Sequence, residues 1–207
     1  EYIMTTRRKF LTTASIRGAA ALATPAIVQA QSTIKWRFQT YAGGALGEHV
    51  TKPVIDYITA NSNGELQVEL FYADQIVPTG ELFQALQRGT IDGVHSDDDS
   101  MASPTPLRMF GGYFPFATKH ILDVPVLFNQ YGLKEIWEEE YAKVGVKWIS
   151  AAGQDPCNFN TKKEITSVGD LDGLRLYSFP TAGSFLAKFG VVPMNIPYED
   201  AEVAVQT

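Results

Sequence analysis

The sequence predicts an α/β fold, because segments of strand character alternate with segments of helix character along most of the chain after residue 32. Its 207 residues suffice for one or two domains. A composition of 45% hydrophobic and 19% charged residues is typical of a packed globular protein. The Gly-Gln-Asp-Pro stretch at 153–156 is the expected boundary between an N-terminal lobe, 31–152, and a second lobe, 153–207.

The first thirty residues, 1–30, predict an export signal. Arg7 and Arg8 precede an apolar run over 18–28, and small Ala30 follows, which is the order of a secretory signal with its cleavage site. The paired arginines resemble a twin-arginine (Tat) signal. The run is too short to span a bilayer. A basic surface helix is the alternative, but we expect export to the periplasm.

Charge and cysteine usage narrow the function classes. The net charge is −6 and no cluster of Lys and Arg marks the chain, which argues against a nucleic-acid partner. Cys157 is the single cysteine, so no intramolecular disulfide is possible. An isolated thiol in an oxidising compartment is expected to be buried and inert.

Periodicity defines the elements of the first half. Ile34, Trp36 and Phe38 alternate with polar residues and predict a half-buried strand. Pro53 is expected to kink the next helix or to mark an early boundary of it, and Thr79 is expected to cap the one after it. The predicted elements are a strand over 33–41, a helix over 45–60, a strand over 65–71, a helix from 79 to 89 and a strand over 90–94.

The second half opens with a stretch, 97–130, in which three aspartates, prolines and aromatics predict loops and short helices. A helix with Leu133, Ile136 and Trp137 on one side is predicted next. The further predicted elements are that helix over 131–145, strands over 146–153 and 158–165, a capped turn at Ser167 and Asp170, a strand over 173–177, a helix over 181–189 closed by Gly190, and a last helix from Tyr198.

Arg175 is the first candidate for a binding residue. In the strand GLRLY, Arg175 and Tyr177 lie on the face opposite the leucines, so they can face a cleft while the leucines face the core. A guanidinium matches a carboxylate with two parallel hydrogen bonds. The alternative is an internal ion pair with Asp170 or Asp172.

Ser178 and Thr181 follow at the start of the next helix, where backbone N–H groups attract anions. We count both as candidate ligand-binding residues, with ordinary helix capping as the alternative.

Four segments resemble the extracytoplasmic solute-binding proteins of tripartite ATP-independent periplasmic (TRAP) transporters, of the type that binds dicarboxylates or monocarboxylates. They are ELFQALQRGTIDG (81–93), EITSVGDLDGLRLYSF (164–179), FLAKFGVVPMNIP (185–197) and EDAEVAVQT (199–207). The resemblance implies a two-lobed, type II periplasmic-binding-protein fold that closes on its ligand. Members are longer, so we expect this chain to be truncated at its C-terminus, with the second lobe and hinge incomplete.

The resemblance also implies a function and a ligand site. Such proteins capture a small organic acid and deliver it to a small and a large integral membrane subunit, and they are not enzymes. The family's ligand-anchoring arginine falls on Arg175.

A glutamine of the branch that binds oxo acids falls near Gln154 and can help to hold a cation. The other cation ligands of that branch would lie beyond Thr207, so no metal site or cofactor is predicted. Asn195 could reach the cleft, or be an exposed loop amide.

The aspartates 97–99 follow the predicted strand at its cleft-facing end. Asp99 in the cleft would repel a second carboxylate or recognise an amino or hydroxyl group, so we expect a ligand with one anchored carboxylate and a polar or cationic other end. A solvated acidic loop is the alternative.

Catalytic motifs are missing from the sequence. It has no G-x-S-x-G, H-E-x-x-H, C-x-x-C or P-loop, and its histidines, His49, His95 and His120, lack metal-ligand spacing. A periplasmic hydrolase is therefore a weak hypothesis. A solute-binding protein of an ABC importer is a stronger rival, and a sensor subunit is a third hypothesis.

Overall fold

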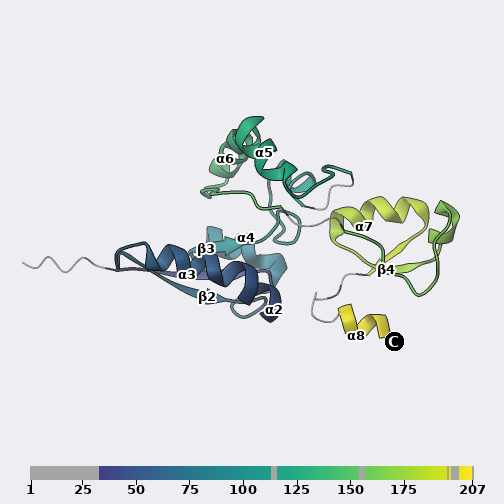
Figure 1. Cartoon of the computed structure of the whole chain (residues 1–207), viewed down its shortest axis with the longest axis horizontal. Coiled ribbons are helices and arrows are strands. Elements are labelled where there is room, and N and C mark those ends of the chain that lie inside the picture. Colours follow the sequence, from purple (N-terminus) through teal and green to yellow (C-terminus); the bar gives the residue numbers. More distant parts are fainter. Residues whose placement is uncertain (1–32, 113–115, 154–156, 195, 197–200, 207) are drawn as a thin grey trace, which may run out of the picture. The chain divides into compact units, whose positions relative to one another are not determined.

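The computed structural model describes residues 33–112, 116–153, 157–194, 196 and 201–206, which Figure 1 shows in colour. These residues form two parallel sheets whose strands are joined through helices. Within this part of the chain, no helix is both long enough and apolar enough to cross a membrane.

The larger sheet has the strand order β2-β1-β3, and all its strands are parallel. The strands are β1 (Ile34–Thr40), β2 (Leu66–Phe71) and β3 (Gly93–His95). The strands predicted over 33–41 and 65–71 are confirmed, and the third lies three residues later than its predicted start. Register pairs Ile34 with Leu66, and Thr40 with His95 at the carboxyl ends of β1 and β3.

Helices form the crossovers, because parallel neighbours cannot be joined by a tight hairpin. The predicted helix over 45–60 is divided just before Pro53, which occupies the first turn of its last part, where no backbone donor is needed. The segments are α2 (Gly44–Leu46), the π-helical η1 (Gly47–Thr51) and α3 (Lys52–Ala60) before β2, then the 3₁₀ turn η2 (Thr79–Glu81) and α4 (Leu82–Gln87) before β3.

Thr79 does not cap its helix as predicted. Its backbone N–H and its hydroxyl both donate to Asp74 Oδ1, at 2.7 and 3.2 Å. The Thr79 hydroxyl is therefore occupied outside the helix, and the Asp74 side chain fixes the start of η2.

Between β3 and residue 144, the described residues contain three helical segments. They are the 3₁₀ turn η3 (Pro106–Met109), α5 (Asp123–Gln130) and α6 (Leu133–Lys143). Trp137 and Tyr141 of α6 are buried and Leu133 is partly buried against the same core, while the predicted Ile136 is 46% exposed. The predicted face is therefore correct at Leu133 and Trp137 and wrong at Ile136, and the i, i+4, i+8 stripe packs on a core that contains Phe83 of α4 and Ile91, which lies just before β3.

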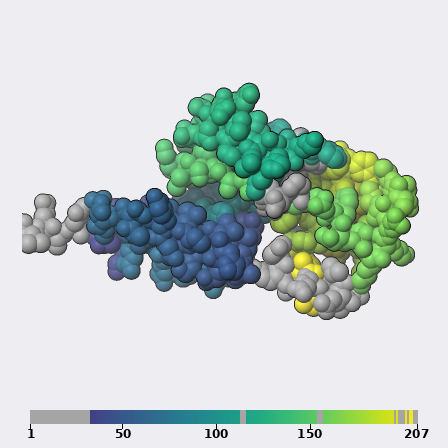
Figure 2. All heavy atoms as spheres, in the orientation of Figure 1, coloured from purple at the N-terminus to yellow at the C-terminus, as the bar shows by residue number. Residues whose placement is uncertain are grey.

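The strands predicted over 146–153 and 158–165 are wrong, because neither segment is strand among the described residues. A strand exists only where a neighbour pairs with its backbone. The first segment instead lies against α5 and α6 (Figures 1 and 2), and its Trp148 ring stacks on Phe128 at 5.4 Å. Cys157 is exposed, contrary to expectation, since it lies in this irregular region.

The smaller sheet is a parallel pair that brackets one helix. Its elements are the 3₁₀ turn η4 (Val168–Leu171), β4 (Arg175–Tyr177), α7 (Pro180–Leu186), the 3₁₀ turn η5 (Ala187–Phe189), β5 (Val192–Met194) and, beyond the sheet, α8 (Ala201–Gln206). The capping box of Ser167 and Asp170 is confirmed. Gly190 ends the helix as predicted, with φ of 85° that suits glycine. Buried Gly183 lets α7 approach Pro193 of β5.

The loop after β3 lies inside the protein. Asp98 and Asp99 are buried, and Gly111 and Gly112 pass directly over them. A β-carbon at Gly111 would overlap the Asp98 carboxylate, so only glycine permits this close approach.

Gly111→Ala should lower the free energy of unfolding by about 1–3 kcal/mol, because a methyl group forced against a buried carboxylate must displace it. Urea denaturation of the variant and the unaltered protein measures the change. Gly80→Ala is the matched control, since nothing lies within 4 Å of its β-carbon position. Equal stabilities of the two variants would show that the loop gives way freely.

Candidate functional site

Arg175 opens β4 and its side chain is exposed. Within the described part of the chain, it forms no hydrogen bond or ion pair. Asp170 accepts its hydrogen bonds from Thr166 and Ser167, and these bonds lower the pKa of that carboxyl. The internal pair with Asp170 or Asp172 is not formed, which leaves the guanidinium available to an external anion.

Three further candidates, Tyr177, Ser178 and Thr181, lie around the start of α7. The Tyr177 ring is partly buried and meets Phe179 edge to face at 5.7 Å. The Ser178 hydroxyl donates to the Phe179 carbonyl at 3.3 Å. The Thr181 N–H donates to Asp99 Oδ2 at 2.8 Å, so an internal carboxylate already occupies the anion position that we expected at this helix start.

Asp99 links three parts of the chain. Its side chain is fully buried, and its Oδ1 lies 3.0 Å from Nε of Arg108 while its Oδ2 accepts from Thr181. Both oxygens are thus engaged by the protein. Asp99, predicted as a ligand residue, is placed here in contact with the predicted Thr181.

Asp98 and Asp97 differ in how fully they are satisfied. Asp98 accepts from Trp137 Nε1 at 3.1 Å and from the Tyr141 hydroxyl, and burial together with this carboxylate raises the pKa of Tyr141. Asp97 Oδ1 accepts from the N–H groups of Asp99 and Ser100. Asp97 Oδ2 is buried with no partner among the described residues, and desolvation raises the pKa of Asp97. Asp97 therefore retains an unused acceptor.

A cluster at the ends of β1 and β3 is a site that sequence reasoning missed. Thr40 Oγ1 and Thr51 Oγ1 lie 3.0 and 2.9 Å from Nδ1 of His95. Both threonines are buried and His95 is partly buried. Burial lowers the pKa of His95, so its imidazole is neutral at pH 7. The polar ends of two adjacent strands were the signal that could have identified it.

The donors and acceptors around Thr40 determine which ring nitrogen of His95 carries the proton. Thr40 Oγ1 accepts from the Ala42 N–H at 3.1 Å and from the Thr51 hydroxyl at 3.2 Å, so its own proton must go elsewhere. The remaining neighbour is Nδ1, which therefore accepts and leaves the proton on Nε2. The opposite tautomer would leave the buried Thr40 hydroxyl proton unpaired, at a cost of about 1–3 kcal/mol.

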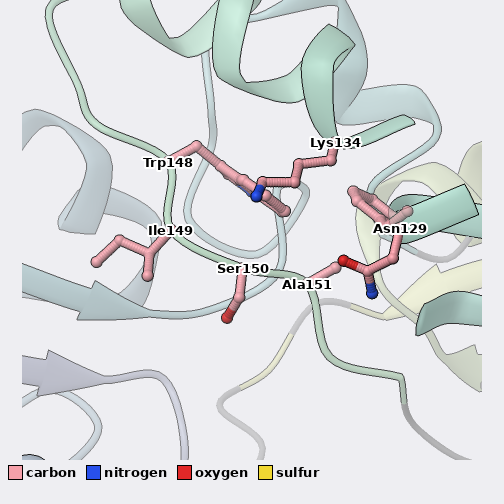
Figure 3. A pocket seen from close by; sticks show the side chains of 7 residues that line it. Asn129, Lys134, Trp148, Ile149, Ser150 and Ala151 are labelled. Atoms are coloured by element: carbon pink, nitrogen blue, oxygen red, sulfur yellow. The ribbon is translucent and has the colours of Figure 1, made fainter. Parts of the chain in front are cut away.

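A hollow of about 70 Å³ lies between α5, α6 and the segment after Trp148. Asn129, Lys134 and Ser150 are among the residues that line it (Figure 3). Sites for small molecules usually measure about 300–1,000 Å³. This hollow is therefore too small to be the solute site.

Two predicted site residues, Gln154 and Asn195, lie outside the described residues. Among the residues that are described, no three His, Cys, Asp or Glu side chains gather closely enough to hold a metal ion.

Comparison with known proteins gives consistent results. The model of bacterial extracellular solute-binding protein family 7 (DctP) matches residues 43–207. A TRAP periplasmic solute-binding protein from Chromohalobacter salexigens, solved with bound (S)-(+)-2-amino-1-propanol, is 66% identical, with a TM-score of 0.79 over 84% of this chain and 55% of that one. A TRAP transporter solute-binding protein from Bordetella bronchiseptica, with calcium and picolinate, is 21% identical, with a TM-score of 0.71 over 84% of this chain and 52% of that one.

A curated relative, the monocarboxylate 2-oxoacid-binding periplasmic protein of a Nostoc species, is 27% identical over 205 residues, which cover 92% of this chain and 55% of that protein. This chain thus spans about half the length of these relatives. The structural matches confirm the predicted α/β, two-lobed type II fold class. All of these relatives are solute-binding proteins and none is an enzyme.

Thr51→Val should lower the free energy of unfolding by about 0.5–1.5 kcal/mol, because it removes the hydroxyl that donates to Thr40. Thr59→Val is the matched control, since the Thr59 hydroxyl is buried with no partner among the described residues and its loss should be neutral or stabilising. Urea denaturation of both variants measures the difference. A Thr59→Val variant less stable than Thr51→Val would refute the hydrogen-bond network.

Proposed function

Since the chain belongs to the DctP family of bacterial extracellular solute-binding proteins, family 7, we propose that it captures a small organic acid and delivers it to the membrane subunits of a TRAP transporter. The observation that carries this proposal is the exposed Arg175, which has no partner among the described residues although carboxylates are close in sequence. Its ligand is a carboxylate that the protein itself does not supply.

The binding free energy expected from Arg175 and its neighbours is that of a micromolar site for a small solute. A guanidinium pairs with a carboxylate through two parallel hydrogen bonds and stays charged at every physiological pH. A micromolar site requires about −8 kcal/mol. One desolvated bidentate pair, further hydrogen bonds and contact with the Tyr177 ring are sufficient for that value. Gln154, Ser178 and Asn195 are the residues that we propose to complete the contacts on this side.

The remaining parts of the proposal concern location and partners. Residues 1–30 direct export by the Tat route and are removed after Ala30, so the protein acts in the periplasm. Residues 31–152 form the first lobe and 153–207 belong to the second. The partners are the small and large integral membrane subunits of the transporter. The family match and the TRAP relatives favour this system over an ABC importer.

A second candidate ligand is an amino alcohol. The relative that is 66% identical was solved with (S)-(+)-2-amino-1-propanol, which has an ammonium group and no carboxylate. An ammonium needs an acceptor, and Asp97 Oδ2 is an acceptor that no described residue uses. A solute with a carboxylate and an amino or hydroxyl group would suit both Arg175 and this acidic loop.

Arg175→Ala should weaken binding of the organic acid by about 2–5 kcal/mol, or roughly 30-fold or more, because the carboxylate loses its charged partner. A thermal-shift screen of the full-length protein first identifies the acid, and isothermal titration calorimetry then gives Kd for each variant.

Arg88→Ala is the matched control for this experiment. Arg88 is also exposed, but its guanidinium donates to its helix neighbour Gln84 at 3.3 Å. This control should bind as the unaltered protein does. Equal affinities of the Arg175 and Arg88 variants would contradict the proposed anchor.

Solute charge tests the ligand class directly. A monocarboxylate with an amino or hydroxyl group should bind more tightly than a dicarboxylate of the same length, because the Asp97 carboxylate, whose Oδ2 has no partner among the described residues, would repel a second anion. Calorimetry with such a pair, and with 2-amino-1-propanol, ranks the affinities. Tighter binding of the dicarboxylate would refute this preference, and binding of the amino alcohol alone would favour the second candidate.

A further inference from the structure

The topology of the larger sheet identifies where a ligand meets it. In open parallel sheets, ligands bind beyond the carboxyl ends of the strands, at the point where the strand order reverses. With the order β2-β1-β3, that point lies between β1 and β3. Thr40 and His95 are register partners there, and each is the last residue of its strand.

The imidazole of His95 is held in one orientation. Its Nδ1 is occupied by the hydroxyls of Thr40 and Thr51, and the Tyr41 ring meets it edge to face at 5.5 Å. The Tyr41 N–H also donates to the His95 carbonyl at 2.9 Å. Among the described residues Nε2 has no hydrogen-bond partner, and the side chain is only partly buried. The ring therefore presents one oriented N–H group that the described protein leaves unused.

We infer that His95 is a specificity-determining residue, whose neutral Nε2–H donates a hydrogen bond to an oxygen atom of the bound solute. This role rests on the proposed function as a solute-binding protein. Because Nδ1 must accept from the Thr40 hydroxyl, Nε2 can only donate. It therefore selects a carbonyl, carboxylate or hydroxyl oxygen at this point and rejects an ammonium. The role holds for either candidate ligand, since an organic acid and an amino alcohol both contain an oxygen acceptor.

Two substitutions of His95 test the roles of Nδ1 and Nε2 one at a time. Asn places its amide near the position of Nδ1, so His95→Asn keeps an acceptor for the Thr40 hydroxyl and loses the donor toward the solute. Gln places its amide near Nε2, so His95→Gln keeps that donor. We expect His95→Asn to weaken binding by tenfold or more, and His95→Gln to weaken it less than threefold. Calorimetry uses the full-length protein, with pyruvate, lactate and (S)-2-amino-1-propanol as probes.

The tautomer is measured independently of any ligand. Long-range ¹H–¹⁵N correlation spectra at pH 7.5 should show His95 protonated at Nε2 alone, with the exposed His49 as an internal reference. A proton on Nδ1 would overturn the inference, whatever the binding data show.

The binding outcomes distinguish this inference from the function on which it rests. If the unaltered protein binds a probe and His95→Asn binds it equally well, the role of His95 is refuted and the proposed function stands. If the unaltered protein binds none of the probes, nor any acid or amine of a wider screen, the proposed function fails and the role of His95 fails with it.

Discussion

The carboxylates of Asp98 and Asp99 are buried, and much of the structure depends on how they are hydrogen-bonded. A charged group that is removed from water must receive all its hydrogen bonds from donors of the protein. Asp98 obtains them from Trp137 and Tyr141 on α6. Asp99 obtains them from Arg108 and from the backbone of Thr181, which lies 82 residues further along the chain. One short loop after β3 thereby holds the 3₁₀ turn η3 and the helices α6 and α7 by polar contacts.

The same loop continues directly from the strand that ends in His95. Because the loop is held by its buried carboxylates, the end of β3 is fixed beside the end of β1, where Thr40 orients the imidazole. The Arg175 guanidinium belongs to the separate β4–α7–β5 unit. A cationic group and an oriented neutral donor thus stand on two different sheets. The imidazole, held by the threonines, would lose little freedom on binding a solute, which favours affinity through preorganisation, whereas the exposed Arg175 side chain would have to be ordered.

Local patterns in the sequence predicted the elements that depend on neighbours close in the chain. The capping box of Ser167 and Asp170 and the glycine end at Gly190 were correct, because both are completed within a few residues. The strands over 146–153 and 158–165 were wrong, because a strand requires a paired backbone that local periodicity cannot supply. The predicted face of α6 was correct at Leu133 and Trp137 but wrong at Ile136, and it missed Tyr141, whose hydroxyl donates to the distant Asp98.

By itself, the sequence determined the α/β alternation, the family resemblance and the position of Arg175 on the outer face of its strand. These follow from periods of two and 3.6 residues and from short motifs, which are properties of contiguous residues. Only the tertiary structure decided that Asp99 is engaged inside the protein and that His95 presents a single donor. Both results depend on hydrogen-bond partners between 9 and 82 residues away, and burial makes those partners obligatory.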